Sequence, residues 1–193
     1  MNWDWFDERP LLMAIAGSNG AGKTTFFHAH VEPAGLRFVN ADCLAATLDI
    51  DVYLAARIAQ DIRHELVDQG ESFVFETVLS DPVGEKVRFL ADAVGRGYTV
   101  VLCFIWIESA DQSEERVAMR VTQGGHDVPS GKLRSRYPRT IMNLNIAIQS
   151  LPHVLLFDNS DLAKPFRHVA HTLEGRLQIL VDPVPNWLDD LTS

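Results

Sequence analysis

The chain has 193 residues, of which 47% are hydrophobic, and its formal net charge at pH 7 is −9. A chain of this length can bury one apolar core, so we predict a single domain over residues 1–193. Its acidity makes general nucleic-acid binding a poor prediction, because the phosphate backbone attracts basic surfaces.

The N-terminus and the cysteines indicate a reducing compartment. The first residues, Met1–Trp5, are polar and acidic, unlike the apolar core of a signal peptide. No window approaches the roughly 18–20 apolar residues that a membrane span needs. Cys43 and Cys103 have neither metal-ligand nor disulfide spacing, and we predict that both pack as small apolar side chains. We therefore expect a cytoplasmic protein with no membrane partner.

Apolar runs that predict strands alternate with helical segments along the chain. The predicted strands are Leu11–Ala16, Arg37–Asp42, Ser72–Leu79, Thr99–Ile107 and Val154–Phe157. The predicted helices are Gly22–His30, Val52–Gln69, Val83–Val94, Asp111–Val121 and Ile141–Leu151. The tail, Phe166–Val181, indicates a hairpin around Glu174 and Gly175. This order predicts a three-layer α/β fold, with a five-stranded, mostly parallel sheet and helices on both faces.

The first predicted strand leads into a complete phosphate-binding motif. It matches G-x-x-x-x-G-K-[ST] at every position, between an apolar strand and a helix. The glycines let backbone N–H groups surround phosphates, Lys23 reaches the β- and γ-phosphates, and the Thr24 hydroxyl is a Mg²⁺ ligand. The predicted ATP-binding residues of this loop are Gly17, Ser18, Asn19, Gly20, Ala21, Gly22, Lys23, Thr24 and Thr25. An ordinary glycine turn is the alternative, but a chance match is on the order of one in a hundred.

Asp42 ends the second predicted strand, at the edge where parallel sheets bind their ligands. There its carboxylate can accept the proton of an attacking hydroxyl, or hold Mg²⁺ through water. The alternative is a helix N-cap for the segment that follows. Spacing alone supports the two interpretations equally.

Glu76 and Thr77 end the third predicted strand at the same edge. We predict that they bind the substrate, with a structural ion pair as the alternative for Glu76. The most apolar strand, Thr99–Ile107, is followed by a single acid, Glu108, so a Walker B carboxylate is not obvious. This pattern favours a small-molecule kinase over an ATPase motor.

Residues 116–139 are basic although the chain is acidic, with six basic side chains and one acid, and hence a net charge of +5. The basic residues are Arg116, Arg120, Lys132, Arg134, Arg136 and Arg139. Arg116 and Arg120 stand four residues apart, with no carboxylate three or four residues from either. Such a like-charge pair is unfavourable unless an anion binds, and arginine suits phosphate geometry.

Glycines and prolines divide this basic segment into two helices. Gly124 and Gly125 interrupt it, Pro129 follows, and Pro138 is predicted to kink the second helix or to begin a new one. The arrangement predicts a lid that closes over phosphates. A solvated surface and RNA or DNA binding are the alternatives. His126, a lone histidine in this loop, is left out of the predicted site.

Asn159 follows the fifth predicted strand, in a loop that can pass near the nucleotide base. We predict that it contacts the nucleotide. The alternative is an Asx turn, which the triplet Asp158-Asn159-Ser160 favours.

Together these residues resemble the zeta toxin family, which phosphorylates UDP-N-acetylglucosamine with ATP, and its small chromosomal members in particular. The resemblance covers nearly the whole chain. It is carried by Ala16–Thr25, Asn40–Asp42, Phe75–Thr77, Arg116–Val121, Gly124–His126, Val128–Pro129, Arg134, Arg136–Tyr137, Arg139 and Asn143.

The resemblance implies a kinase core related to nucleotide and shikimate kinases, with ATP and Mg²⁺. It implies that Asp42 is the catalytic base. It also implies that Arg120 and Arg134 correspond to lid arginines that hold phosphates, with Arg116 and Arg136 as rivals.

The sequence therefore predicts an ATP-dependent phosphotransferase that acts on a hydroxyl of a small molecule, with a UDP-activated amino sugar as the acceptor that the resemblance implies. One alternative is a nucleotide hydrolase or switch that acts with a protein partner, such as an antitoxin-like regulator. A nucleic-acid-processing P-loop protein is the other. ADP release that depends on an acceptor separates the first interpretation from both.

Overall fold

The computed structural model describes residues 7–122, 128–173 and 176–192. Its strands are β1 (Leu11–Ala16), β2 (Arg37–Val39), β3 (Phe73–Thr77), β4 (Thr99–Trp106), β5 (His153–Asp158), β6 (Arg167–Leu173) and β7 (Arg176–Ile179). Its helices are α1 (Lys23–Phe26), α2 (Ala41–Leu48), α3 (Val52–Asp68), α4 (Glu85–Gly95), α5 (Ala110–Thr122), α6 (Ser130–Ser150) and α7 (Asn186–Thr192). A π-helical turn, Phe27–Val31, continues α1. The predicted lid residues Gly124, Gly125 and His126, and the predicted hairpin residues Glu174 and Gly175, lie outside the described residues.

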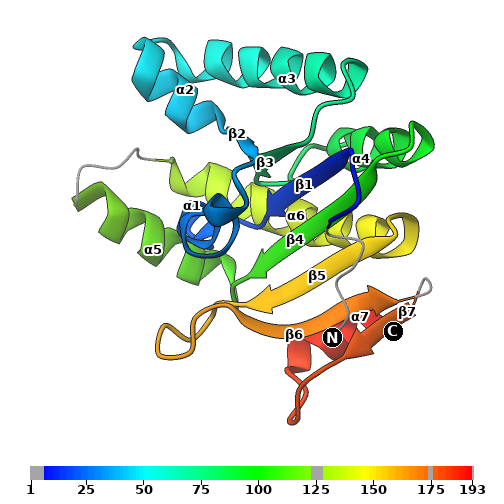
Figure 1. Ribbon diagram of the computed structural model, residues 1–193. Helices are drawn as coiled ribbons and strands as arrows, with labels where there is room; N and C mark the ends of the chain where they lie inside the picture. Colours follow the sequence, from blue (N-terminus) through cyan, green and yellow to red (C-terminus); the bar gives the residue numbers. More distant parts are fainter. Residues whose placement is uncertain (1–6, 123–127, 174–175, 193) are drawn as a thin grey trace.

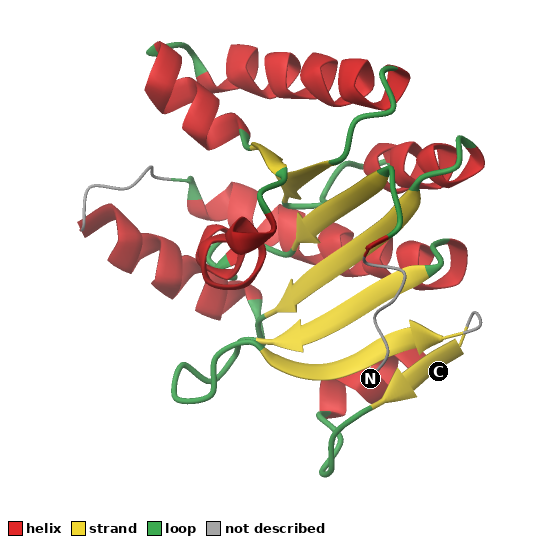
Figure 2. Ribbon diagram, in the orientation of Figure 1, coloured by secondary structure: helices red, strands yellow, loops and turns green. Residues whose placement is uncertain are grey.

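The strands form one sheet in the order β2-β3-β1-β4-β5-β6-β7 (Figures 1 and 2). Strands β1 to β5 are parallel, and β6 and β7 are antiparallel. The five-stranded parallel core and the C-terminal hairpin are confirmed, but the sheet itself has seven strands rather than five. The hairpin joins the sheet because Val169 and Ala170 of β6 are fully buried and extend the core beyond β5.

Helices cover the two faces of the sheet unequally, because alternate strand residues point to opposite faces. The larger apolar cluster includes Leu12, Phe75 and Leu102 and is covered by α3, α4, α6 and α7. The smaller cluster includes Met13 and Cys103 and is covered by α1 and the turn that continues it. The predicted three layers are confirmed. None of the described helices is both long and apolar enough to cross a membrane.

Helix α6 is longer than the sequence predicted, since it begins at Ser130 and contains Pro138. A proline inside a helix removes one backbone hydrogen bond and normally kinks or ends the helix. Leu133, Thr140 and Leu144 nevertheless lie buried along one face of α6. Packing of this face against the rest of the molecule therefore outweighs the local effect of Pro138.

Candidate active site

The loop between β1 and α1 has the backbone geometry of a phosphate cradle. Gly17, Gly20 and Gly22 have positive φ angles of 145°, 75° and 90°, which favour glycine. A Cβ atom at Gly17 would lie 2.4 Å from the carbonyl oxygen of Ile105 on β4, so no side chain fits there. The chain can therefore turn tightly around a site where backbone N–H groups surround an anion.

Lys23 lies at the end of this loop and is only 6% exposed. Its Nζ donates a hydrogen bond to the carbonyl oxygen of Ser18 at 3.0 Å. Burial lowers the pKa of Lys23, the carboxylates of Glu76 and Asp42 oppose that effect, and Arg120 adds to it. The structure thus brings Asp42, Glu76 and Arg120 within electrostatic reach of the P-loop lysine.

Glu76 lies beside the P-loop because β3 is the neighbour of β1, with Glu76 level with Ile15. Its Oε2 accepts hydrogen bonds from the Thr24 hydroxyl at 2.7 Å and from Asn40 Nδ2 at 2.9 Å. Its Oε1 is 3.8 Å from Lys23 Nζ. Glu76 thus places a carboxylate against the P-loop hydroxyl, as a Walker B carboxylate would, whereas the sequence made no such carboxylate obvious after β4.

Asp42 lies in the first turn of α2 rather than at the end of a strand. The strand ends at Val39, and Asn40 caps α2 by accepting hydrogen bonds from the N–H groups of Asp42 and Cys43 at 2.8 and 3.2 Å. The predicted alternative role of Asp42, the N-cap, therefore belongs to Asn40. Asp42 is exposed. Sequence reasoning missed Asn40, although the Asn-Ala-Asp triplet was its signal.

Cys43 and Cys103 have different environments. Cys103 is buried, as predicted, and burial raises the pKa of its thiol to about 12. Cys43 is exposed, so the prediction that it packs is wrong. Burial raises the pKa of Cys43, and so do the nearby carboxylates of Glu76 and Asp42. Cys43 therefore lies beside the candidate site because it follows Asp42 on the helix.

Helix α5 packs against the P-loop. The Ser113 hydroxyl donates a hydrogen bond to the carbonyl oxygen of Asn19 at 2.7 Å, and Ser113 is 1% exposed. A Cβ atom at Gly20 would lie 3.0 Å from the Cβ atom of Arg116, so the loop and the helix are in close contact. Ser113 belongs to no recognisable motif, so its contact with the P-loop could not be predicted from the sequence.

Asn159 and Arg116 have structural partners in the described part of the chain. Asn159 is 3% exposed, and its Nδ2 donates to the carbonyl oxygen of Ala21 at 2.8 Å. Arg116 Nη2 donates to the carbonyl oxygens of Asn159 and Ser160 at 2.8 and 3.1 Å. The two side chains thereby hold the loop after β5 against the P-loop. Their predicted contacts with ATP stay predictions.

Arg134 joins α6 to α5 through two carboxylates. It lies 2.7 Å from Asp111 Oδ1 and 2.8 Å from Glu114 Oε1, and 57% of its side chain is exposed. These hydrogen bonds and charges raise the pKa of Arg134. Exposed ion pairs of this kind are weak, so a phosphate can replace the carboxylates. The ion pairs of Arg134 with Asp111 and Glu114 were not predicted, because both acids lie before the basic segment in the sequence.

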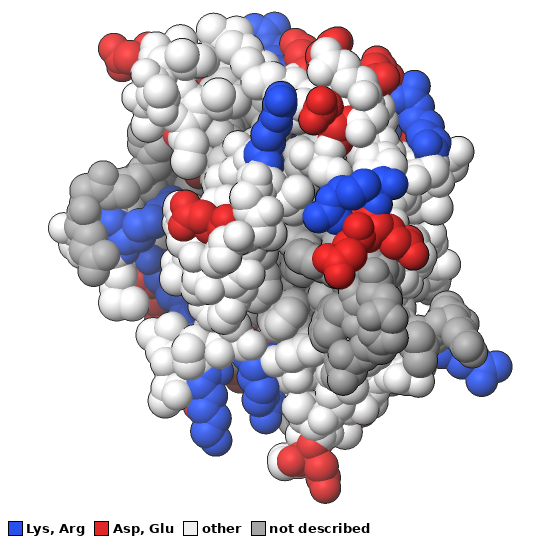
Figure 3. Space-filling model, viewed as in Figure 1, with Lys and Arg blue, Asp and Glu red and all other residues white. Residues whose placement is uncertain are grey.

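The remaining predicted residues lie around this centre. Thr77 is buried, and its hydroxyl accepts a hydrogen bond from the N–H group of Leu79 at 3.0 Å. Thr25 is exposed on α1, and Arg136 is partly buried on α6. Basic side chains gather at the left of Figure 3, over the region of α5, although the whole chain is acidic.

These residues fit Mg-ATP. The Thr24 hydroxyl and the Glu76 carboxylate are hydrogen-bonded beside the buried Lys23, which places hard oxygen ligands and a positive charge at one end of the phosphate cradle. No group of three or more His, Cys, Asp or Glu in the described ranges could hold a metal ion. Mg²⁺ does not need such a cage, since substrate phosphates and water supply most of its ligands.

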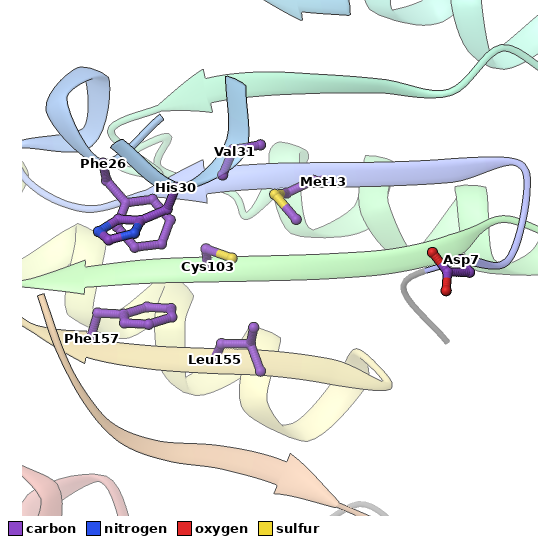
Figure 4. A pocket seen from close by; sticks show the side chains of 8 residues that line it. All are labelled: Asp7, Met13, Phe26, His30, Val31, Cys103, Leu155 and Phe157. Carbon is purple, nitrogen blue, oxygen red and sulfur yellow. The ribbon is translucent and has the colours of Figure 1, made fainter. Parts of the chain in front are cut away.

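An apolar cavity of about 330 Å³ lies apart from these residues (Figure 4). It lies between the turn after α1 and the sheet, where Phe26, His30, Cys103 and Phe157 point into it. None of the predicted site residues lines it, and the Cys103 thiol in its wall is protonated at neutral pH because of its raised pKa.

The parallel sheet order, the P-loop after its central strand and the Glu76–Thr24 pair define the class of P-loop kinases. The zeta toxin family model matches residues 53–162, more than half of the chain. The chain therefore belongs to the zeta toxin family, as its resemblance predicted. The match includes Glu76, Arg120 and Arg134, and it begins after the P-loop and Asp42. No curated protein matches the chain.

Several solved structures have a similar fold. The AvrRxo1-ORF1:ORF2 structure with ATP is 19% identical, with a TM-score of 0.73, over 98% of this chain and 65% of that chain. A suspected kinase from Chloroflexus aurantiacus is 20% identical, with a TM-score of 0.57, over 81% of this chain and 92% of that chain. A structure from the PezAT toxin–antitoxin system of Streptococcus pneumoniae is 14% identical, with a TM-score of 0.54, over 79% of this chain and 69% of that chain. The likeness shows the fold, and this chain spans just under two thirds of the AvrRxo1 chain.

Proposed function

We propose that the chain transfers the γ-phosphate of ATP to a hydroxyl of a small molecule, with Mg²⁺ as the metal. The observation that carries this proposal is the 2.7 Å hydrogen bond from Thr24 to Glu76, beside the buried Lys23. A hydroxyl, a carboxylate and an ammonium group at the end of a P-loop are the groups that Mg-ATP requires. Membership of the zeta toxin family supports the same chemistry.

In this proposal, some residues of the site bind the metal and others bind the phosphates of ATP. Thr24 and Glu76 would hold the metal, which would supply positive charge against the phosphate oxygens. Lys23 and Arg120 hold the phosphates, and Arg134 joins them after exchanging its carboxylate partners on α5. Positive charge placed in advance stabilises the charge that develops during transfer.

Asp42 serves as the base. Its carboxylate accepts the proton of the acceptor hydroxyl while the hydroxyl oxygen forms a bond to the γ-phosphorus. The bond from that phosphorus to the bridging oxygen breaks, and ADP leaves with the electron pair. The exposure of Asp42 and its effect on the pKa of Lys23 support this role, because they put the carboxylate near the phosphate end of the site and open to an acceptor.

The proposed acceptor and the proposed protein partner are both suggested by similar proteins. A UDP-activated amino sugar is the first acceptor to test, because of the resemblance to zeta toxins. AvrRxo1-ORF1 was crystallised with ORF2, and the PezAT structure comes from a toxin–antitoxin system. On that ground we propose an antitoxin-like protein as a partner of this chain.

Acceptor-dependent release of ADP tests the proposed function. We expect ADP release to rise above the acceptor-free rate with one class among UDP-sugars, nucleosides and small sugars. Glu76→Gln, which removes the charge that holds the metal, should abolish that increase. Equal release with and without every acceptor would instead favour a nucleotide hydrolase or switch. Salt-sensitive retention of RNA would favour the nucleic-acid alternative.

Arg120→Ala and Arg134→Ala should lower kcat more than they weaken ATP binding. Arginines of a lid act mostly on charge that appears during transfer, and loss of one such donor costs roughly 10²–10³ in kcat. The measurement is kcat, KM and ATP affinity for both variants, with Arg96→Ala, directly after α4, as a surface control. Weaker ATP binding at an unchanged kcat would mean that these arginines only dock the phosphates.

A further inference from the structure

The C-terminal helix α7 contacts the ends of two strands that lead into the site. Trp106 on β4 and Asp158 on β5 are level with each other in the parallel ladder, so their side chains point to the same face of the sheet. The Trp187 ring of α7 is stacked on the Trp106 ring, with centroids 4.1 Å apart and 7° between the ring planes. Trp187 Nε1 also donates a hydrogen bond to Asp158 Oδ2 at 3.3 Å. One side chain of α7 thus joins the two strand ends.

Asp158 is a largely buried carboxylate, with 14% of its side chain exposed. Its Oδ1 accepts a hydrogen bond from the N–H group of Ser160 at 2.9 Å, and its Oδ2 lies 3.7 Å from Arg167 Nη2. A carboxylate at this depth is stable only with such partners. Trp187 is therefore one of the donors that fix the direction in which the chain leaves β5.

Asn159, the next residue, connects this strand end to the P-loop. Its N–H group donates to the carbonyl oxygen of Trp106 at 2.9 Å, and its Nδ2 donates to the carbonyl oxygen of Ala21 at 2.8 Å. A Cβ atom at Gly22 would lie 2.9 Å from Asn159 Nδ2, so a displaced Asn159 would displace the loop directly before Lys23. Ala21 belongs to the smaller apolar cluster, whereas α7 covers the larger one. The edge of the sheet is thus held between α7 on one face and the P-loop on the other.

The indole N–H of Trp187 is not needed to attach α7 to the core. Leu188, the next residue of the helix, is fully buried in the larger apolar cluster and provides that attachment. Any aromatic ring can stack on Trp106, but among aromatic side chains of this shape the hydrogen bond to Asp158 needs the indole donor. The N–H group of Trp187 therefore serves to orient Asp158 and the turn after it.

We propose that Trp187 is a positioning residue for ATP, which holds the P-loop in its nucleotide-binding form through Asp158 and Asn159. This inference rests on the proposed function, because it takes Gly17–Thr24 as the ATP site. Asn159 can fix Ala21 only while the turn after β5 keeps its place. A loop that is competent in only a fraction of the molecules binds its ligand with an affinity lowered by that fraction. The coupling is reciprocal, so bound nucleotide should also hold α7 more firmly against the sheet.

Trp187→Phe tests this role, because it keeps the ring that stacks on Trp106 and removes only the N–H donor. We expect the Kd of Mg-AMP-PNP to rise roughly 10-fold, the scale of one lost hydrogen bond to a charged group, while kcat at saturating ATP changes little. Hydrogen exchange reads the same loss without nucleotide. Residues 17–26 should exchange faster in the variant, and α3 should be unchanged. AMP-PNP should slow the exchange of residues 186–192 in the unmodified protein, and less so in the variant.

Leu188→Val is the matched control on the same helix, since it removes one buried methylene group and leaves the donor to Asp158 in place. It should lower the melting temperature without changing AMP-PNP affinity or the exchange of residues 17–26. Asn159→Ala supplies the second comparison, because it removes the contact with Ala21. In that background Trp187→Phe should weaken AMP-PNP binding no further.

Unchanged AMP-PNP affinity in Trp187→Phe, or an equal loss in Leu188→Val, would overturn the positioning role and leave the kinase proposal intact. Additive losses in Trp187→Phe and Asn159→Ala would overturn the route through Asn159. Failure of the unmodified protein to bind AMP-PNP would count against the proposed function, and the exchange of residues 17–26 would still show whether Trp187 holds the loop.

Discussion

Lys23→Ala should lower acceptor-dependent phosphotransfer by roughly 10³-fold or more. The ammonium group is the buried positive charge at the end of the P-loop, and it neutralises the β- and γ-phosphates as charge develops on them. Its place beside Glu76, 3.8 Å away, also balances the carboxylate that we assign to the metal. The variant should still fold, because burial already disfavours the charged form of Lys23.

Lys164→Ala is the control for this experiment, since Lys164 is an exposed lysine on the connection between β5 and β6. Turnover, ATP affinity and melting temperature should be measured on both variants. We expect the control to match the unmodified protein in all three. Near-normal turnover in Lys23→Ala would remove the P-loop assignment, whatever its melting temperature.

Asp42→Asn should lower transfer to the acceptor by roughly 10²–10⁴-fold, the usual effect of losing a general base. The change keeps the size of the side chain and removes its charge. ATP should bind nearly as well, because the proposed contacts are made by the P-loop, Lys23 and Arg120. Stability should change little, since Asn40 and not Asp42 caps α2, and a charge in the first helical turn contributes only about 0.3–1 kcal/mol.

Two further variants separate catalysis by Asp42 from a structural effect on α2. Asp42→Ala should lose as much turnover as Asp42→Asn and remain folded. Asn40→Ala should lower the free energy of unfolding by about 1 kcal/mol, because it removes the cap. Full turnover in Asp42→Asn would mean that Asp42 is not the base, and the nucleotide-switch interpretation would then replace the kinase.

Much of the fold could be predicted from local pattern. The bounds of β1 were predicted without error, and β4 and α3 within a residue, because long apolar runs and amphipathic periodicity are read from neighbours in the chain. Helix α2 was missed, since its cap residue Asn40 was assigned to a strand. The early start of α6 was missed as well, because Pro138 locally disfavours a helix that packing maintains.

The candidate site was predicted unevenly for a similar reason. The P-loop residues Gly17–Thr24 could be predicted from the sequence alone, because the glycine turn, the lysine and the hydroxyl that bind phosphates lie next to one another along the chain. The partners of Arg134 and Arg116 could not be predicted, since Asp111, Glu114 and the carbonyl oxygen of Asn159 reach them through the packing of α5, α6 and the loop after β5.

The sequence by itself determined that this protein has a P-loop, an alternating α/β order and a basic segment of the zeta toxin type. Each of these depends on residues close together along the chain. Only the tertiary structure decided that Glu76 meets Thr24, because that contact requires β3 to pair with β1. Strand order and helix packing set the distances between residues that are remote in sequence, and the local pattern does not contain them.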